Sequence, residues 1–158
     1  DHLVAMVAVG IWGAQLGRPA IWILPITFPI VMALGGLLGI SGLPIPTTLV
    51  EIGIALSALI LGLLVALRLQ IPIWAAAVIV AVFAVCHGHA HGTELPSAAN
   101  ALAYGVGFVV ATGLLHLCGI LLGELNRFST GEKVVRVIGV LIAILGLVFL
   151  SGPVSDLF

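Results

Sequence analysis

Residues 85 to 96 of this chain read VCHGHAHGTELP and contain three of its five histidines together with a glutamate. If the segment is helical, His91 lies about 40° and Glu94 about 20° from His87 around the axis, so the three share one face. Two imidazoles one turn apart, followed by a carboxylate, can bind a single divalent transition-metal ion. His89 points away from that face, which fits a solvated or supporting role as well as direct ligation.

Two residues at the start of the chain could complete the same set of ligands. Asp1 and His2 precede an apolar stretch and would lie near the end of the histidine-rich segment in a neighbouring helix. Glu51 is a further candidate, but Thr48 and Glu51 also match the capping box of a helix start, where a carboxylate is favoured for local reasons. All of these polar groups could alternatively be solvated at a membrane boundary.

His116 differs from the other histidines because it lies well inside an apolar stretch. An ionisable side chain at membrane depth is costly and is a functional candidate for that reason. Gly119 and Gly123 form a GxxxG pair on the same helical face, which predicts that this face packs against protein. His116 is therefore either a functional residue at membrane depth or part of an interhelical hydrogen bond that only supports packing.

The composition defines the class of protein in which these residues act. Hydrophobic residues make up 62% of the 158 residues and charged residues only 7%, and the mean hydropathy is +1.38. Such a chain is an integral membrane protein, so the lipid bilayer is its first partner. A net charge of -1 with so few charged residues provides no basic patch for nucleic acid.

The apolar residues fall into six stretches separated by short breaks with glycine, proline or charge, the last break carrying a second capping box at Ser129 and Glu132. A bilayer core about 30 Å thick needs about 20 helical residues, which these stretches approach or reach. We therefore predict an all-α polytopic membrane protein, a bundle of about six transmembrane helices in a single domain over residues 1–158. The expected helices cover residues 1–16, 21–40, 48–67, 72–91, 98–122 and 134–151.

The basic residues predict the orientation of this bundle. All five fall in or beside alternate breaks: Arg18 in the first, Arg68 in the third, and Arg127, Lys133 and Arg136 around the fifth. By the positive-inside rule that side is cytoplasmic, so both termini and the candidate ligands lie outside. An external start would also fit a chain from which a signal peptide has been removed.

The chain resembles the HupE/UreJ family of membrane proteins over nearly its whole length, from DHLVAMVAVGIWGAQLG onward. Two family signatures carry the resemblance: a histidine followed at a fixed distance by Asp-His in the first helix, and Phe-His-Gly-x-x-His-Gly-x-Glu in the fourth. Asp1 and His2 match the end of the first signature, whose leading histidine would precede them. Cys86 replaces the aromatic residue of the second signature and adds a candidate soft ligand. The residues that match the second signature are His87, Gly88, His91, Gly92 and Glu94.

Members of this family are regarded as nickel or cobalt permeases, often encoded with hydrogenase or urease. The resemblance implies a secondary transporter that imports Ni²⁺, with Co²⁺ as a second candidate, across the inner (plasma) membrane. It would bind the ion as substrate, with no separate cofactor, and a homo-oligomer is compatible with it. Zn²⁺ would bind the same groups, so selectivity rests on the resemblance. The expected metal ligands are Asp1, His2, His87, His91 and Glu94, followed in weight by His89, His116 and Glu51.

Two other functions fit the same residues. An intramembrane metal-dependent hydrolase would use them to hold Zn²⁺ and activate water, although HExxH is absent and Glu94 is the only evident general base. A channel for a small neutral molecule would have the histidines line its opening. We expect a permease rather than an enzyme. Because the sequence has no nucleotide-binding loop, active transport would draw on a gradient or a partner.

Overall fold

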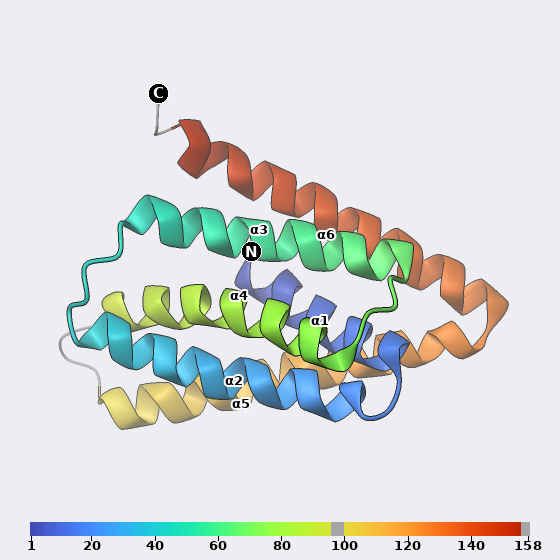
Figure 1. Ribbon diagram of the computed structural model, residues 1–158, viewed down its shortest axis with the longest axis horizontal. Coiled ribbons are helices and arrows are strands. Elements are labelled where there is room, and N and C mark those ends of the chain that lie inside the picture. The colour runs from blue at the N-terminus through green and yellow to red at the C-terminus, as the bar shows by residue number, and fades with distance from the viewer. Residues whose placement is uncertain (96–99, 156–158) are drawn as a thin grey trace.

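The computed structural model describes residues 1–95 and 100–155, and within them every regular element is helical. Figure 1 shows the long helices running back and forth along one axis, which is the arrangement of a helical membrane bundle. The fold class predicted from the composition is thereby confirmed. The elements are α1 (His2–Leu16), α2 (Ala20–Ile40), α3 (Thr47–Leu67), α4 (Ile73–Thr93), α5 (Ala101–Gly123), the short 3-10 helix η1 (Glu124–Arg127) and α6 (Ser129–Ser155).

The predicted boundaries of the helices hold closely in the middle of the chain and less well at its end. The helices α2 and α3 begin one residue before the predicted positions and end where expected, and α4 continues through Thr93. The last helix was predicted from residue 134 but begins at Ser129, so its first turns carry charged side chains. The predicted start of the fifth helix, at residue 98, lies outside the described residues.

Both predicted capping boxes are wrong. Helix α3 begins at Thr47, with Pro46 as its N-cap, and has no side-chain capping bond. A proline side chain has no oxygen that could accept a capping bond, but its fixed φ, near the helical value, defines the backbone just before the helix. At α6 the carbonyl of Phe128 accepts from the Glu132 N–H at 2.8 Å, which places Ser129 inside the first turn. Glu132 forms an ion pair with Arg68 of α3 at 2.8 Å instead.

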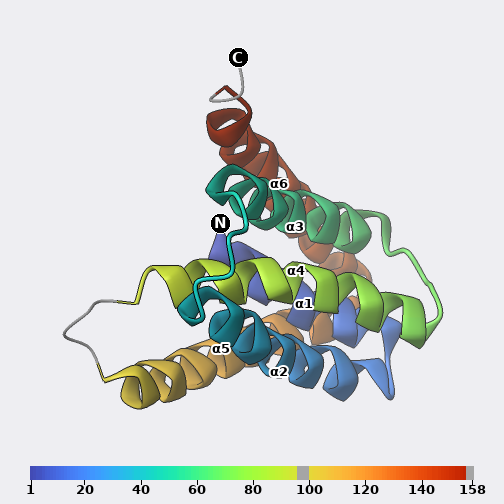
Figure 2. The same cartoon turned by 60° about the vertical axis from the view of Figure 1, so that its left-hand side comes forward.

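The helices form three layers of two, with α3 and α6 on one side, α1 and α4 in the middle, and α2 and α5 on the other (Figures 1 and 2). The closest pairs are α2 with α4, α3 with α6, and α1 with α5. At each of these seams, glycine lets two backbones touch. A Cβ at Gly88 would run into the carbonyl of Met32 on α2, and one at Gly10 would run into the carbonyl of His116 on α5. Close approach at small residues is the usual basis of helix packing in membranes.

Among the described residues, five helices are long and apolar enough to cross a membrane, and α1, with 15 residues, is shorter. The N-terminal end of α1 lies within the length of the bundle, beside the last turns of α4, where His2 contacts His87 and His91 (Figures 1 and 2). Eight of its residues are buried, because α1 is surrounded by helices of all three layers. Because α1 starts short of the end of the bundle, which we call its inset start, His2 lies next to His87 of α4.

The five basic residues occupy one end of the bundle, which we call the basic end. Arg18 follows α1, Arg68 caps α3, and Arg127, Lys133 and Arg136 belong to η1 and the first turns of α6. Arg136 donates to the carbonyl of Ala66 at 3.0 Å, and Arg127 pairs with Glu124. This clustering is what the loop assignment predicted, while the side of the membrane that it faces stays a prediction.

Candidate metal-binding site

Three histidine rings from two helices meet inside the bundle and form what we call the histidine cluster: His2 of α1 with His87 and His91 of α4. The centre of the His2 ring lies 4.5 Å from that of His87 and 4.5 Å from that of His91. His87 is fully buried. Because it precedes the end of α4 by six residues, it lies about 9 Å inside that end. The solvated interpretation is therefore wrong for His87.

Asp1 determines which nitrogen of His2 can accept a metal. The carboxylate of Asp1 caps α1 by accepting from the His2 backbone N–H at 2.7 Å, and it also contacts His2 Nδ1 at 2.7 Å. Since a carboxylate only accepts, the Nδ1 atom carries the proton in this contact. The other ring nitrogen, Nε2, then presents its lone pair. Asp1 thus orients His2 in the way that carboxylates orient metal-binding histidines in other proteins.

Ser57 of α3 has the same effect on His87. Its hydroxyl donates to the carbonyl of Ile54 at 2.6 Å, so the single hydroxyl proton is already used. The contact of 2.8 Å between Ser57 Oγ and His87 Nε2 must then use the proton of the imidazole. His87 Nδ1 is left with its lone pair. Ser57 is completely buried, which keeps water from competing for this bond.

Three nitrogens of the cluster, one from each ring, are buried and have no hydrogen-bond partner. They are His2 Nε2, His87 Nδ1 and His91 Nε2, and a native protein seldom leaves such atoms unsatisfied without a reason. Two imidazoles at right angles around one ion would have ring centres roughly 4.5 Å apart, given a metal–nitrogen bond of about 2.1 Å. Yet in the described part of the chain no group of three His, Cys, Asp or Glu side chains is already arranged to hold an ion. The ligand set therefore stays a prediction that requires side-chain rotation.

Aromatic side chains cover the cluster on two sides. Phe108 of α5 lies against His91, with ring centres 3.8 Å apart, and Phe28 of α2 lies 5.3 Å from His87. Phe28 is fully buried. These rings exclude water from two approaches to the imidazoles. His91 also lines an apolar pocket between α2, α4 and α5, while His2 lines a polar pocket.

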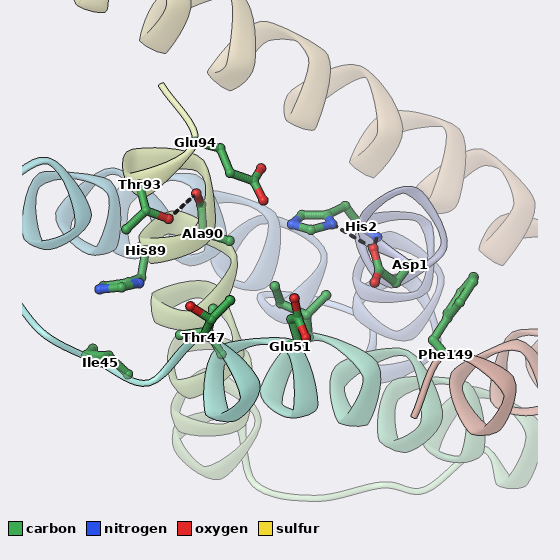
Figure 3. Close-up of a pocket in the computed structure, with 12 residues that line it drawn as sticks. Asp1, His2, Ile45, Thr47, Glu51, His89, Ala90, Thr93, Glu94 and Phe149 are labelled. Atoms are coloured by element: carbon green, nitrogen blue, oxygen red, sulfur yellow. Dashed lines mark hydrogen bonds and ion pairs between the residues drawn. The ribbon is translucent and has the colours of Figure 1, made fainter. Parts of the chain in front are cut away.

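That pocket has a volume of about 350 Å³ and carries three carboxylates, those of Asp1, Glu51 and Glu94. In Figure 3 the side chain of Glu94 points toward His2 from the end of α4, while Glu51 rises from α3 below them. Glu94 is close enough to His2 to interact with it electrostatically. Because the capping box is absent and Glu51 lies beyond the first turn of α3, Glu51 does not cap that helix. Its carboxylate instead adds negative charge to this pocket, which we call the acidic pocket. A cation approaching the cluster would therefore meet an attractive potential.

His89 lies apart from the cluster, as its position on the helix predicted. Figure 3 shows its ring directed away from His2. It is 3% exposed, and its Nε2 lies 3.2 Å from the carbonyl of Leu43, in the segment between α2 and α3. The solvated interpretation of His89 is therefore wrong, and its ring ties α4 to that segment.

Two further candidates are also separated from the cluster. His116 of α5 is buried and has no partner on either ring nitrogen; Phe28 stands between it and His87, 5.4 Å from His116. Cys86 packs among the apolar residues between α3 and α4, with its sulfur beside Gly53. Its thiol thus belongs to a helix seam and does not join the histidines.

Sequence reasoning missed three residues of this site: Ser57, Phe28 and Phe108. Each lies in an apolar stretch in which a serine or phenylalanine is unremarkable, and each becomes relevant only through a contact with a distant helix. The one available signal was Ser57, since a hydroxyl at membrane depth needs a partner. Its carbonyl partner lies within α3, however, and its histidine partner could not be identified without the fold.

The long apolar helices and the buried histidine cluster define a multi-pass helical membrane protein with a candidate cation site inside its bundle. The chain belongs to the HupE / UreJ family, whose sequence profile matches residues 1–149. It is 49% identical over 152 residues to Protein HupE of Rhizobium leguminosarum bv. viciae. The matched segment covers 96% of this chain and 78% of that relative. No solved structure is significantly similar to it. The resemblance inferred from the two signatures is therefore confirmed.

Proposed function

We propose that this protein is a permease that imports Ni²⁺, with Co²⁺ as a second substrate, across the inner membrane. The single observation that carries the proposal is the histidine cluster, where His2, His87 and His91 each keep one buried nitrogen without a partner. Two of those nitrogens present lone pairs because Asp1 and Ser57 hold the opposite nitrogen. Imidazole nitrogen suits nickel and cobalt ions, and membership of the HupE / UreJ family supports a role in nickel transport.

In this mechanism the acidic pocket concentrates cations before the histidines bind them. Asp1, Glu51 and Glu94 line the pocket around His2. Their charge favours a divalent cation over an anion or a neutral solute. The hydrated ion would exchange water for the nitrogens of His2, His87 and His91 and for the carboxylate of Glu94, as these side chains rotate toward it. The carboxylates offset the charge of the ion while it leaves bulk water.

Metal titration of the purified protein tests the ligands directly. We expect His87→Ala, His91→Ala and Glu94→Ala each to abolish high-affinity Ni²⁺ binding measured by isothermal titration calorimetry. His89→Ala is the comparison variant, because it removes a buried histidine of the same helix that lines the acidic pocket but whose Nε2 contacts the carbonyl of Leu43. It should weaken binding much less. Thermal unfolding of each variant confirms that the fold survives. If His87→Ala and His91→Ala bind Ni²⁺ like the parent, the proposed site is wrong.

Flux measurements separate transport from the other functions that such a site allows. Proteoliposomes that contain the parent protein should accumulate Ni²⁺ and Co²⁺, and the three ligand variants should not. Hydrolysis of a lipid or peptide that stops with a chelator, without any metal flux, would instead indicate a metal-dependent hydrolase. Flux of a neutral solute that does not depend on metal would indicate a channel.

A further inference from the structure

Beyond the histidine cluster, His116 is a buried histidine of the described chain for which neither ring nitrogen has a hydrogen-bond partner. It is 1% exposed, and neither ring nitrogen meets the geometry of a hydrogen bond. The ring lies in the bundle seven residues before the end of α5 at Gly123, or about 10 Å from the basic end. An imidazole can both donate and accept a hydrogen bond. Because the buried ring of His116 makes no well-formed bond of either kind, it is available to a ligand that binds transiently.

A second polar atom faces this ring from α2, and its availability follows from the sequence. In an α-helix the N–H of residue 29 would bond to the carbonyl of residue 25, but residue 29 is a proline and has no N–H. The carbonyl of Pro25 is therefore free of its helical partner. It lies within the range of a hydrogen-bond contact with the His116 ring, although the geometry at neither ring nitrogen is that of a well-formed hydrogen bond.

Phe28 separates this pair of atoms from the histidine cluster. Its ring centre is 5.3 Å from His87 and 5.4 Å from His116, and both contacts are edge-to-face, with interplanar angles of 65° and 80°. One aromatic side chain thus divides a histidine about 9 Å from one end of α4 from a histidine about 10 Å from the opposite end of the bundle. A cation can pass the face of such a ring favourably, because the ring carries negative charge density there.

We propose that His116 and the carbonyl of Pro25 form a second, weaker ion site on the basic-end side of Phe28. An ion released from the histidine cluster would bind there before it leaves. One imidazole and one carbonyl, with water completing the shell, hold a divalent ion less tightly than three imidazoles do. A weak site releases its ion readily, which conduction requires of each site along a path. The inference rests on the proposed transport function but concerns a separate site.

Two variants test the pair from its two sides. His116→Ala removes the imidazole and should slow Ni²⁺ uptake into proteoliposomes by at least about tenfold, the lower end of the range for losing a group that supports a bound metal. Pro29→Ala restores the N–H that bonds to the carbonyl of Pro25, and so occupies that oxygen without removing any side chain of the site. It should slow uptake several-fold. In both variants calorimetric Ni²⁺ binding at the histidine cluster should match the parent.

Pro25→Ala is the matched control for Pro29→Ala. It also replaces a proline in α2, but the bond it restores goes to the carbonyl of Ile21, which lines a pocket at the basic end. The carbonyl at position 25 still lacks its helical partner, so uptake should fall less than in Pro29→Ala. If Pro25→Ala and Pro29→Ala slow uptake equally, the effect is one of helix shape and the proposed site is wrong.

The outcomes distinguish this proposal from the transport function on which it rests. Unchanged uptake by His116→Ala, with altered thermal stability, would show that His116 only packs and would overturn the second site while leaving the histidine cluster intact. Absence of Ni²⁺ uptake by the parent would overturn both. If His116→Ala fails to fold, the comparison of the two proline variants decides the question.

Discussion

At the scale of single residues, the candidate site depends on where two protons lie. Asp1 accepts a hydrogen bond from the imidazole of His2, and Ser57 accepts one from the imidazole of His87. Neither residue therefore needs to touch the ion to affect its binding. Groups of this kind fix the tautomer and orientation of a metal-binding histidine. The sequence placed Asp1 among the ligands, and the structure offers an orienting role for it through His2 as well.

Ser57→Ala tests this orienting role. Without the hydroxyl, nothing holds the His87 proton on Nε2, so Ni²⁺ affinity should fall by about 10 to 100-fold. The loss should be smaller than that caused by His87→Ala, which removes the ligand itself. Calorimetric titration with Ni²⁺ measures both.

Ser41→Ala is the matched control for that experiment. The Ser41 hydroxyl donates to the carbonyl of Leu38 at 2.7 Å, the same local bond that Ser57 makes to Ile54 at 2.6 Å, but it contacts no histidine. Its replacement should leave affinity unchanged. Equal affinities of the Ser57 and Ser41 variants would show that the serine does not set the tautomer of His87.

At the scale of helices, the glycines of the histidine-rich segment act in packing. Gly88 and Gly92 follow His87 and His91 directly, and each lies against the backbone of α2, at Met32 and Gly36. The histidines thus meet α1 while the glycines beside them meet α2. The alternation of histidine and glycine in this segment therefore combines a candidate binding face with a packing face on one helix.

Gly88→Ala should disrupt the contact between α2 and α4. The added Cβ would run into the carbonyl of Met32, a backbone atom that cannot move aside without moving its helix. Overpacking of this kind costs typically about 1–3 kcal/mol, so the midpoint of thermal unfolding should fall by several degrees. Ni²⁺ affinity should fall as well, because α4 positions His87.

Gly113→Ala is the comparison variant for this effect. Gly113 lies within α5, and nothing is within 4 Å of a Cβ placed there. Alanine should be tolerated, or should slightly stabilise the helix through its higher propensity. A thermal midpoint for Gly88→Ala that equals that of Gly113→Ala would show that the two helices are not held at the distance described.

Much of this arrangement could be predicted from the sequence, and the remainder has identifiable physical causes. Hydropathy located the helices because a bilayer imposes their length, and helical periodicity placed His89 away from His87. The capping boxes failed because Pro46 and Phe128 already precede the helices. Neither the inset start of α1 nor the pairing of Ser57 with His87 has a local signal, since both arise from contacts between distant helices.

At the scale of the whole molecule, charge is divided between the two ends of the bundle. Asp1, Glu51 and Glu94 surround the acidic pocket, while Arg18, Arg68 and Arg127 line a pocket at the basic end. If the basic end faces the cytoplasm, as the positive-inside rule predicts, the acidic pocket faces outward. An ion would then be captured at the acidic pocket on the outside and released at the basic end on the inside.

Cysteine labelling measures that orientation. Ser41 and Ser129 are both exposed and lie at opposite ends of the bundle, Ser41 after α2 and Ser129 at the start of α6. In a background that lacks Cys86 and Cys118, Ser41→Cys should react with a membrane-impermeant maleimide added to spheroplasts, because its end of the bundle is predicted to face outward. Ser129→Cys should react only after the membrane is permeabilised. Each variant thus serves as the control for the other. The reverse pattern would place the histidine cluster near the cytoplasmic surface, where its position would suit release of an ion and not its capture, and the import mechanism would fail even if the cluster binds Ni²⁺.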